Sequence, residues 1–261
     1  MTIDYHIHDI APYVNWDYFF YAWGMHNKPQ NEKERLRIEA DDVLEKIAGR
    51  YSVHAVFELM DAHSEGDDIV VGDGRRIPML RQQQAESEYL CLADFIHPVY
   101  DRIGIFATTV DLGMEKDFDG DAYMKMMVQL LADRLAEAAA ERLHEAVRKT
   151  YWGYAPEEQL TMQELHAEKF QGIRPAVGYP SLPDTSLNFV LNDLIGMHQI
   201  GIRLTESGAM KPHASVSGLM IAHPQAHYFS LGTIGEDQLT DYARRRGLPI
   251  EILRKFLAAS L

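Results

Sequence analysis

The pattern of apolar and polar positions predicts amphipathic helices and short strands along the whole chain. A helix is expected from about residue 31 to 48, where apolar residues recur at helical spacing among charges until Gly49. Apolar runs bounded by turn residues predict strands at 53–59, 69–71, 75–80, 103–110, 200–205, 214–222 and 228–231. Shorter helices are expected at 16–25, 162–170, 236–246 and 249–257.

The longest predicted helix runs from about residue 121 to 152, and Gly153 can end it. One side of this helix is apolar, with Met124, Val128, Leu131, Leu135, Ala139, Leu143 and Val147. Another face carries acids at four-residue steps, namely Asp133, Glu137, Glu141 and Glu145. Like charges at this spacing repel each other mildly. For Glu141 and Glu145 we favour a solvent-exposed face, on which Arg134, Arg142 and Arg148 reduce this repulsion.

The strands are bunched and joined by tight turns instead of alternating with helices. Gly72-Asp73-Gly74 is a hairpin signal between two of them. A nucleotide-binding loop is the alternative for these glycines, but no helix begins after them and a third glycine is missing. The pattern therefore predicts an α+β fold with an antiparallel sheet.

Composition narrows the class of protein. The 261 residues are 46% hydrophobic and 25% charged, as in globular domains. The net charge of −14 disfavours nucleic-acid binding and fits either solubility or contact with a basic patch on a partner. Cys91 is the single cysteine, which excludes an internal disulfide and fits a reducing cytosol. We expect a cytoplasmic protein with no membrane span or signal peptide, since the sequence has neither a long apolar run nor a basic leader.

The N-terminus carries two weak signals for a metal or cobalamin site. Asp4-x-His6 begins like the cobalamin-ligating motif Asp-x-His-x-x-Gly, but Asp9 replaces the glycine, and we favour a frayed strand. His6 and His8 could share one face of a strand, yet a mobile terminus is a poor metal site. No histidine lies in an HExxH-like spacing, so we expect no metal site.

A loop at residues 172–180, Gly-Ile-Arg-Pro-Ala-Val-Gly-Tyr-Pro, is the strongest candidate for a binding segment. Its glycines and prolines make it stiff and poor in side chains, so its backbone can approach a ligand closely. Arg174 presents a planar guanidinium that suits a carboxylate. Taken alone, the loop fits equally well a structural turn in which Arg174 forms an internal salt bridge.

Two further stretches follow this loop. Residues 204–218, Leu-Thr-Glu-Ser-Gly-Ala-Met-Lys-Pro-His-Ala-Ser-Val-Ser-Gly, are rich in small residues, which favours close backbone packing over chemistry. His223-Pro224 and then His227-Tyr228-Phe229 come next. The two aromatic residues can offer a face to a planar base, although aromatic residues on a strand more often belong to a core.

In this order the three stretches resemble the reactivation domain of cobalamin-dependent methionine synthase. That family carries a G-I-R-P-A-x-G-Y-P loop, then L-T-E-S-x-A-M-x-P-x-A-S-V-S-G, then H-P-x-x-x-Y-F. The resemblance runs from about residue 11 to the end and includes Trp16 with Phe19 and Phe20, and residues 64–68, 80–83, 91–96, 131–137, 151–155, 237–238 and 241–243. This combination of motifs is highly specific.

The resemblance implies one α+β unit over residues 1–261, with a curved, mostly antiparallel sheet flanked by helices. It also implies S-adenosylmethionine as ligand and cobalamin held by a separate methionine synthase component. In that family the domain supports reductive methylation of inert cob(II)alamin, with an electron from a flavodoxin-type donor. The protein's part is mainly to position the groups that react.

The resemblance also assigns roles to single residues that hold the ligand. Arg174 would hold the methionyl carboxylate, and the backbone around Ala176 would bind the ammonium. Tyr228 and Phe229 would line the adenosyl site.

Three further residues are expected near the reacting groups. Tyr179 matches the point where the loop meets ligand and corrinoid, and Glu137 and Glu168 match acids near the ligand or the corrinoid-facing surface. Acids near a sulfonium stabilise its positive charge. The match likewise favours a functional surface for Asp133.

Two departures from the family pattern bear on ligand binding. Asn15 stands where the family usually has a cofactor-binding aspartate, although its amide oxygen still accepts a hydrogen bond. Residues 181–188 lack the cysteine, histidine, glutamate and lysine of the family segment.

The 261 residues also contain no counterpart of the family's homocysteine, folate and cobalamin modules, so we expect a reactivation subunit that cannot make methionine alone. The alternatives are a non-catalytic interaction or regulatory protein that keeps the fold, and a reactivator of another corrinoid methyltransferase.

Overall fold

The computed structural model describes residues 1–261 except 73, 85–87 and 259. Its elements in chain order are β1 (Thr2–His6), α1 (Ile7–Ile10), η1 (Ala11–Tyr13), α2 (Trp16–Ala22), α3 (Gln30–Ala48), β2 (Ser52–Glu65), β3 (Asp68–Val71), β4 (Arg75–Pro78), η2 (Leu92–Phe95), β5 (Asp101–Val110), α4 (Gly113–Lys116), α5 (Ala122–Ala146), η3 (Val147–Tyr151), α6 (Met162–His166), α7 (Leu187–Ile195), η4 (Met197–Ile200), β6 (Arg203–Leu204), β7 (Met210–Lys211), β8 (Ser215–Met220), α8 (Glu236–Arg246) and α9 (Ile250–Phe256).

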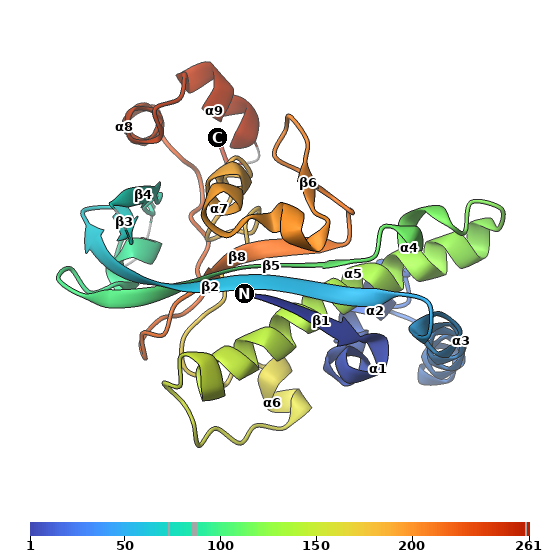
Figure 1. Ribbon diagram of the computed structural model, residues 1–261. Helices are drawn as coiled ribbons and strands as arrows, with labels where there is room; N and C mark the ends of the chain where they lie inside the picture. Colours follow the sequence, from blue (N-terminus) through green and yellow to red (C-terminus); the bar gives the residue numbers. More distant parts are fainter. Residues whose placement is uncertain (73, 85–87, 259) are drawn as a thin grey trace.

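A curved antiparallel sheet forms the centre of the molecule (Figure 1). Its strand order is β4-β3-β2-β5-β8, and β1 pairs with the free part of β2. β2 pairs with β5 along most of its length, and its other edge is shared between β1 and β3. The sheet and its flanking helices confirm the predicted α+β class.

Both faces of β5 are buried, which explains why its sequence is a continuous apolar run. Ile105 and Ala107 pack in the cluster that includes α7. Phe106 faces the other way and packs with residues of α5. Thr108 is also fully buried, and its hydroxyl donates to the carbonyl oxygen of Ala136 on α5 at 2.9 Å, so its polar group is satisfied.

α5 crosses one face of the sheet and carries much of the site described below (Figure 1). Asp121 caps it by accepting hydrogen bonds from two backbone N–H groups of the first turn, each at 3.0 Å. α5 continues into the π-helical turn Val147–Tyr151, and Gly153 with φ of 75° follows. Together the two elements confirm the predicted long helix, with a π turn at its end that the periodicity does not reveal.

The remaining predicted helices and the hairpin are present, although α2 and α6 end before the predicted residues 25 and 170. α3, α8 and α9 match the predicted ranges closely, and α2 begins after Asn15 as its N-cap. β3 and β4 pair as a hairpin with Val71 opposite Arg75. Asp73, on which the predicted turn rests, lies outside the described residues.

Three expectations about elements are wrong, and one helix is missing from them. The strand expected at 200–205 is reduced to the two residues of β6, because η4 and Gly201 precede it. Residues 228–231 form no strand but a loop, in which the N–H of Leu231 donates to the carbonyl oxygen of Pro180 at 3.0 Å. The N-terminal strand is not frayed, because β1 pairs in register with β2 and the Met1 amino group donates to Phe57. α7 is absent from the sequence prediction although its apolar residues have helical spacing and Gly196 ends it.

The two closing helices dock on the β3–β4 hairpin through a buried ion pair. α8 and α9 form an apolar cluster of their own. The guanidinium of Arg245 on α8 lies 2.6 Å from the carboxylate of Asp68 on β3, and both side chains are almost buried. This pair lies away from the cavity described below and provides a matched control for it.

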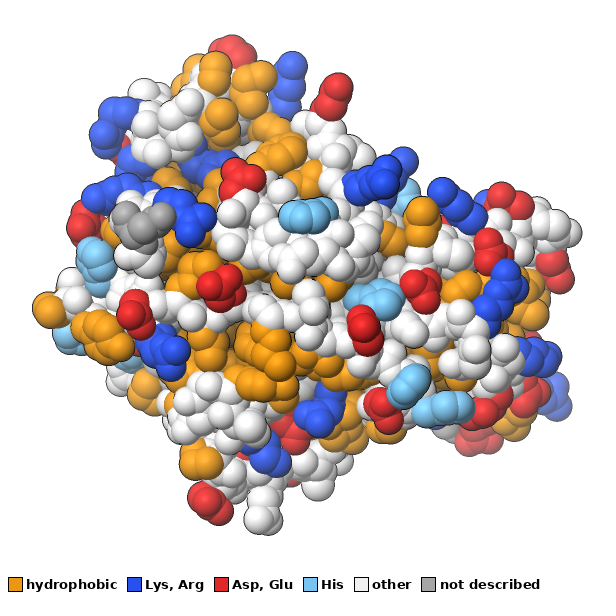
Figure 2. All heavy atoms as spheres, in the orientation of Figure 1, with side chains coloured by type: hydrophobic (Ala, Val, Ile, Leu, Met, Phe, Trp, Pro, Cys, Tyr) orange, Lys and Arg blue, Asp and Glu red, His pale blue; other side chains and the backbone are white. Residues whose placement is uncertain are grey.

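On the face seen in Figure 2, acidic and basic side chains of the described residues are interspersed, and neither sign forms a continuous stripe. Among the described residues, no helix has the length and hydropathy to cross a membrane. The same part of the chain contains no cluster of three His, Cys, Asp or Glu residues arranged to hold a metal ion.

Candidate functional site

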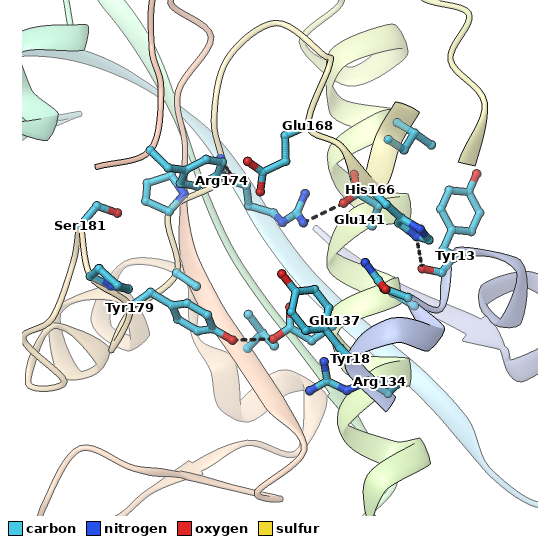
Figure 3. A pocket seen from close by; sticks show the side chains of 18 of the residues that line it. Tyr13, Tyr18, Arg134, Glu137, Glu141, His166, Glu168, Arg174, Tyr179 and Ser181 are labelled. Atoms are coloured by element: carbon cyan, nitrogen blue, oxygen red, sulfur yellow. Dashed lines mark hydrogen bonds and ion pairs between the residues drawn. The ribbon is translucent and has the colours of Figure 1, made fainter. Parts of the chain in front are cut away.

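A cavity of about 750 Å³ opens between α5, the loop 172–180 and the turn after α6 (Figure 3). This volume is in the range of small-molecule sites. Its wall includes the eight residues that the resemblance assigns to ligand or reaction, namely Asn15, Glu137, Glu168, Arg174, Ala176, Tyr179, Tyr228 and Phe229. Asp133, for which a functional surface is expected, is not among the lining residues. The structure thus brings together residues that are more than 200 positions apart in the chain, and their contacts to a ligand stay a prediction.

The loop 172–180 rests directly on β8. The N–H of Leu219 donates to the carbonyl oxygen of Pro175 at 3.0 Å. A Cβ added to Gly218 would lie 2.2 Å from that same oxygen, so only glycine permits this approach. The small residues of 204–218 therefore serve close backbone packing, as predicted, and they fix the loop that carries Arg174.

Arg174 enters the cavity with its guanidinium already engaged (Figure 3). Its Nη2 donates to Oε2 of Glu141 at 3.0 Å, and its Nη1 donates to Nδ1 of His144 at 3.1 Å. Its backbone N–H donates to the hydroxyl oxygen of Tyr228 at 2.9 Å. Both interpretations of this arginine, internal salt bridge and cavity wall, therefore apply at once.

The expectation of a solvated face at Glu141 is wrong. The residue is 8% exposed, and its Oε1 atom is buried without a hydrogen-bond partner among the described residues. Arg148, expected to relieve that face, is fully buried and pairs with Glu158 at 2.7 Å. Glu145 is also shielded and accepts a hydrogen bond from Tyr13 at 2.6 Å. Segments distant in sequence cover this side of α5, so helical periodicity alone cannot reveal its burial.

Glu137 and Glu168 add negative charge to the cavity. The hydroxyl of Tyr179 donates to Oε1 of Glu137 at 2.7 Å. Glu168 has φ of 55°, the only left-handed non-glycine residue in the described part of the chain, a conformation that costs free energy. Its side chain is exposed, its carboxylate has no hydrogen-bond partner among the described residues, and partial desolvation in the cavity raises its pKa although Arg174 opposes this. A bound cation would relieve that cost.

Aromatic side chains form the rim and one wall. Tyr179 is half exposed, and burial of the rest of its ring together with Glu137 raises the pKa of its hydroxyl, which therefore remains a hydrogen-bond donor. Tyr228 lies in the loop after β8, where its hydroxyl supports Arg174. Phe229 combines both roles considered for it, because it lines the cavity and also packs against Phe95 of the core.

The family model described as "Vitamin B12 dependent methionine synthase, activation domain" matches residues 6–247. The chain belongs to this family. Among solved structures, the crystal structure of the MetH reactivation domain bound to AdoHcy is 38% identical and aligns with a TM-score of 0.94. That alignment covers 100% of this chain and 90% of the other. The resemblance stated from the motifs is thereby confirmed.

In this activation domain the two departures from the family pattern have different consequences. The side-chain oxygen of Asn15 accepts the N–H of Asp17 at 3.1 Å and caps α2, so part of its acceptor capacity is used by the helix. Within the segment 181–188, Ser181 alone lines the cavity. Asp184 is fully buried and accepts a hydrogen bond from Tyr242 at 2.8 Å, so this segment mainly supports the fold.

Several residues that line the activation domain's cavity are absent from the sequence-based predictions. Its wall also includes Tyr13, Tyr18, Tyr21, Arg134 and His166. The aromatic segment at 16–25 was the available signal for two of these tyrosines. His144 was missed as well, although it follows Glu141 by three residues and so lies on the same helix face.

Proposed function

We propose that this activation domain binds S-adenosylmethionine in the cavity and supports reductive methylation of cobalamin carried by a methionine synthase component. The observation that carries the proposal is the convergence of all eight predicted site residues on one cavity. A domain that aligns with the whole chain and is described as bound to AdoHcy, the demethylated form of this ligand, adds support.

The cavity has the chemical groups that such a ligand requires. S-adenosylmethionine has a carboxylate, an ammonium, a sulfonium and a planar base. Arg174 keeps three of its five N–H donors after the two hydrogen bonds to Glu141 and His144, and these can bind a carboxylate. The carbonyl oxygen of Ala176 accepts the N–H of Tyr179 and keeps a second lone pair for an ammonium.

The charge balance of the cavity favours a cationic ligand. Its wall holds the three carboxylates of Glu137, Glu141 and Glu168 against the two guanidinium groups of Arg134 and Arg174, an excess of one negative charge. Because Glu141 is already paired with Arg174, the excess belongs to the other acids. A sulfonium placed near them is stabilised more than the neutral thioether of the demethylated form.

The opening of the cavity suits a large planar partner group. Tyr18 and Tyr21 on α2 are 62% and 68% exposed, and Tyr179 lies on the rim beside them. Exposed aromatic residues around a pocket are typical of binding surfaces. When bound, the sulfonium supplies an activated methyl group, while the protein's residues orient it and limit its contact with water. We propose that this rim meets cobalamin of a separate component and that a flavodoxin-type protein supplies the electron.

Calorimetry tests the binding step. We expect S-adenosylmethionine and S-adenosylhomocysteine each to bind once per chain, and Arg174→Ala to weaken both by about two orders of magnitude, because a charge-assisted, bidentate contact is lost. A folded wild-type protein that releases no heat with either ligand would contradict the proposal and favour a regulatory role for the fold. Mixing the ligand-loaded protein with a cobalamin module and a reductant then tests action in trans.

A further inference from the structure

A continuous chain of hydrogen bonds starts at Arg174 and returns to its own loop. Nη1 of Arg174 donates to Nδ1 of His144 at 3.1 Å, and Nε2 of His144 lies 3.3 Å from the hydroxyl oxygen of Tyr154. That hydroxyl donates to the carbonyl oxygen of Gln171 at 3.4 Å. Gln171 directly precedes the loop 172–180, so the chain ties the side chain of Arg174 to the start of the segment that carries it.

The direction of these hydrogen bonds determines which nitrogen of the His144 ring carries the proton. A guanidinium only donates, so Nδ1 of His144 must accept and cannot carry a proton. The remaining nitrogen then carries the single proton and donates to Tyr154. Burial, and then the nearby cations of Arg174 and Arg148, hold the pKa of His144 well below its usual value, which agrees with a neutral ring.

Glu141 acts on the same guanidinium from the neighbouring turn of α5. Its Oε2 accepts from Nη2 of Arg174 at 3.0 Å, and the two side chains are 11% and 13% exposed. Glu141 and His144 stand three positions apart on one helix, so their spacing is set by rigid backbone. Two acceptors on a rigid element, one for each terminal nitrogen, fix the orientation of the planar guanidinium of Arg174.

We infer that Glu141 and His144 are positioning residues that fix the guanidinium of Arg174 before the ligand arrives. The inference rests on the proposed function and goes beyond it, because neither residue belongs to the motifs that indicate the ligand. A preset arginine loses little side-chain entropy on binding, so its donors act at full strength on a carboxylate. The role concerns only the amino-acid end of the ligand.

Two probes separate positioning from general support of the fold. S-adenosylhomocysteine carries the carboxylate, whereas 5′-methylthioadenosine keeps the adenosyl thioether and lacks the amino-acid end. We expect His144→Leu and Glu141→Gln each to raise the Kd for S-adenosylhomocysteine about tenfold and to leave that for 5′-methylthioadenosine within about twofold. His144→Asn, whose side-chain oxygen takes the place of Nδ1, is expected to retain most of the affinity.

Asp68→Asn is the matched control, since it neutralises a similarly buried carboxylate that pairs with Arg245 and Arg76 outside the cavity. It should lower the melting temperature and leave both dissociation constants unchanged. Equal losses for both probes in the two test variants, or no loss for S-adenosylhomocysteine in either, would overturn the inference.

A second measurement needs no variant and no ligand. Nitrogen-15 NMR of the wild-type protein at neutral pH should show His144 protonated at Nε2 alone. A ring protonated at Nδ1 would overturn the inference directly. If the wild-type protein binds neither probe, the proposed function fails, while the NMR result still decides whether the arginine is held as inferred.

Discussion

The contact between Gly218 and the loop 172–180 allows a quantitative test of how the site is built. In Gly218→Ala the new Cβ would lie 2.2 Å from the carbonyl oxygen of Pro175 and 2.9 Å from Cα of Ala176. An ordinary carbon–oxygen contact is about 3.4 Å, so backbone must move by about 1 Å, and the ladder between loop and β8 must open. Overpacking of this kind costs about 1–3 kcal/mol, which lowers the melting temperature by several degrees.

The same movement carries Arg174 away from its position, and a displacement near 1 Å can reduce function about a hundredfold. We therefore expect calorimetry of Gly218→Ala to show a Kd for S-adenosylhomocysteine that is higher by about one to two orders of magnitude. Gly49→Ala is the control, because that glycine has φ of −85° at the end of α3 and nothing within 4 Å of an added Cβ. Wild-type affinity and melting temperature in Gly218→Ala would refute the claim that backbone contact with β8 sets the loop.

Four further outcomes are expected. Glu168→Gln should raise the melting temperature slightly, because a partly desolvated carboxylate without a hydrogen-bond partner among the described residues is removed, and calorimetry should show the preference for S-adenosylmethionine over S-adenosylhomocysteine falling about five- to tenfold. Burial lowers the pKa of His144, so below about pH 6.5 the unfolded chain takes up a proton that the folded chain does not bind. Denaturation at pH 7 and pH 5 should therefore show wild type losing more stability than His144→Leu, and parallel curves would contradict this. Tyr228→Phe leaves the backbone N–H of Arg174 without its acceptor and should cost about 1 kcal/mol of stability in urea titrations, whereas no loss would show that water replaces the hydroxyl. Asn15→Asp keeps the cap of α2 and adds a carboxylate to the cavity, so it should tighten S-adenosylmethionine more than its neutral thioether product, and an unchanged ratio would place residue 15 away from the sulfonium.

Local signals explain why much of the fold follows from the sequence. The cap at Asp121, the helical apolar stripe and Gly153 define the long helix without help from other segments. β3 and β5 are largely apolar between turn residues, β4 follows from the hairpin signal, and the predicted positions of all three agree with the structure. The site residues follow from motifs, since periodicity contains no information about a ligand.

The errors occur where a residue's surroundings come from distant parts of the chain. Glu141 follows the charged pattern of a solvated helix face, yet Arg174 from a loop 33 positions later covers it. Tyr228 lies in an apolar run that suggests a strand, but its backbone has no neighbouring strand to pair with, and its hydroxyl is used by the loop. Pattern analysis predicts which elements form, while burial depends on which elements meet.

Under the proposed function, different charged groups of the cavity act on the two ends of the ligand. Because Arg174 is already neutralised by Glu141, its attraction for a carboxylate is local and depends on geometry more than on net charge. The unpaired carboxylate of Glu168 and the hydrogen-bonded one of Glu137 act on positive charge instead, over a longer range. Loss of the methyl group removes the sulfonium charge and leaves the carboxylate intact, so a spent ligand loses only the second kind of interaction. Under the proposed function, we therefore expect this site to release the demethylated form more readily, while it still binds the amino-acid end that both forms share.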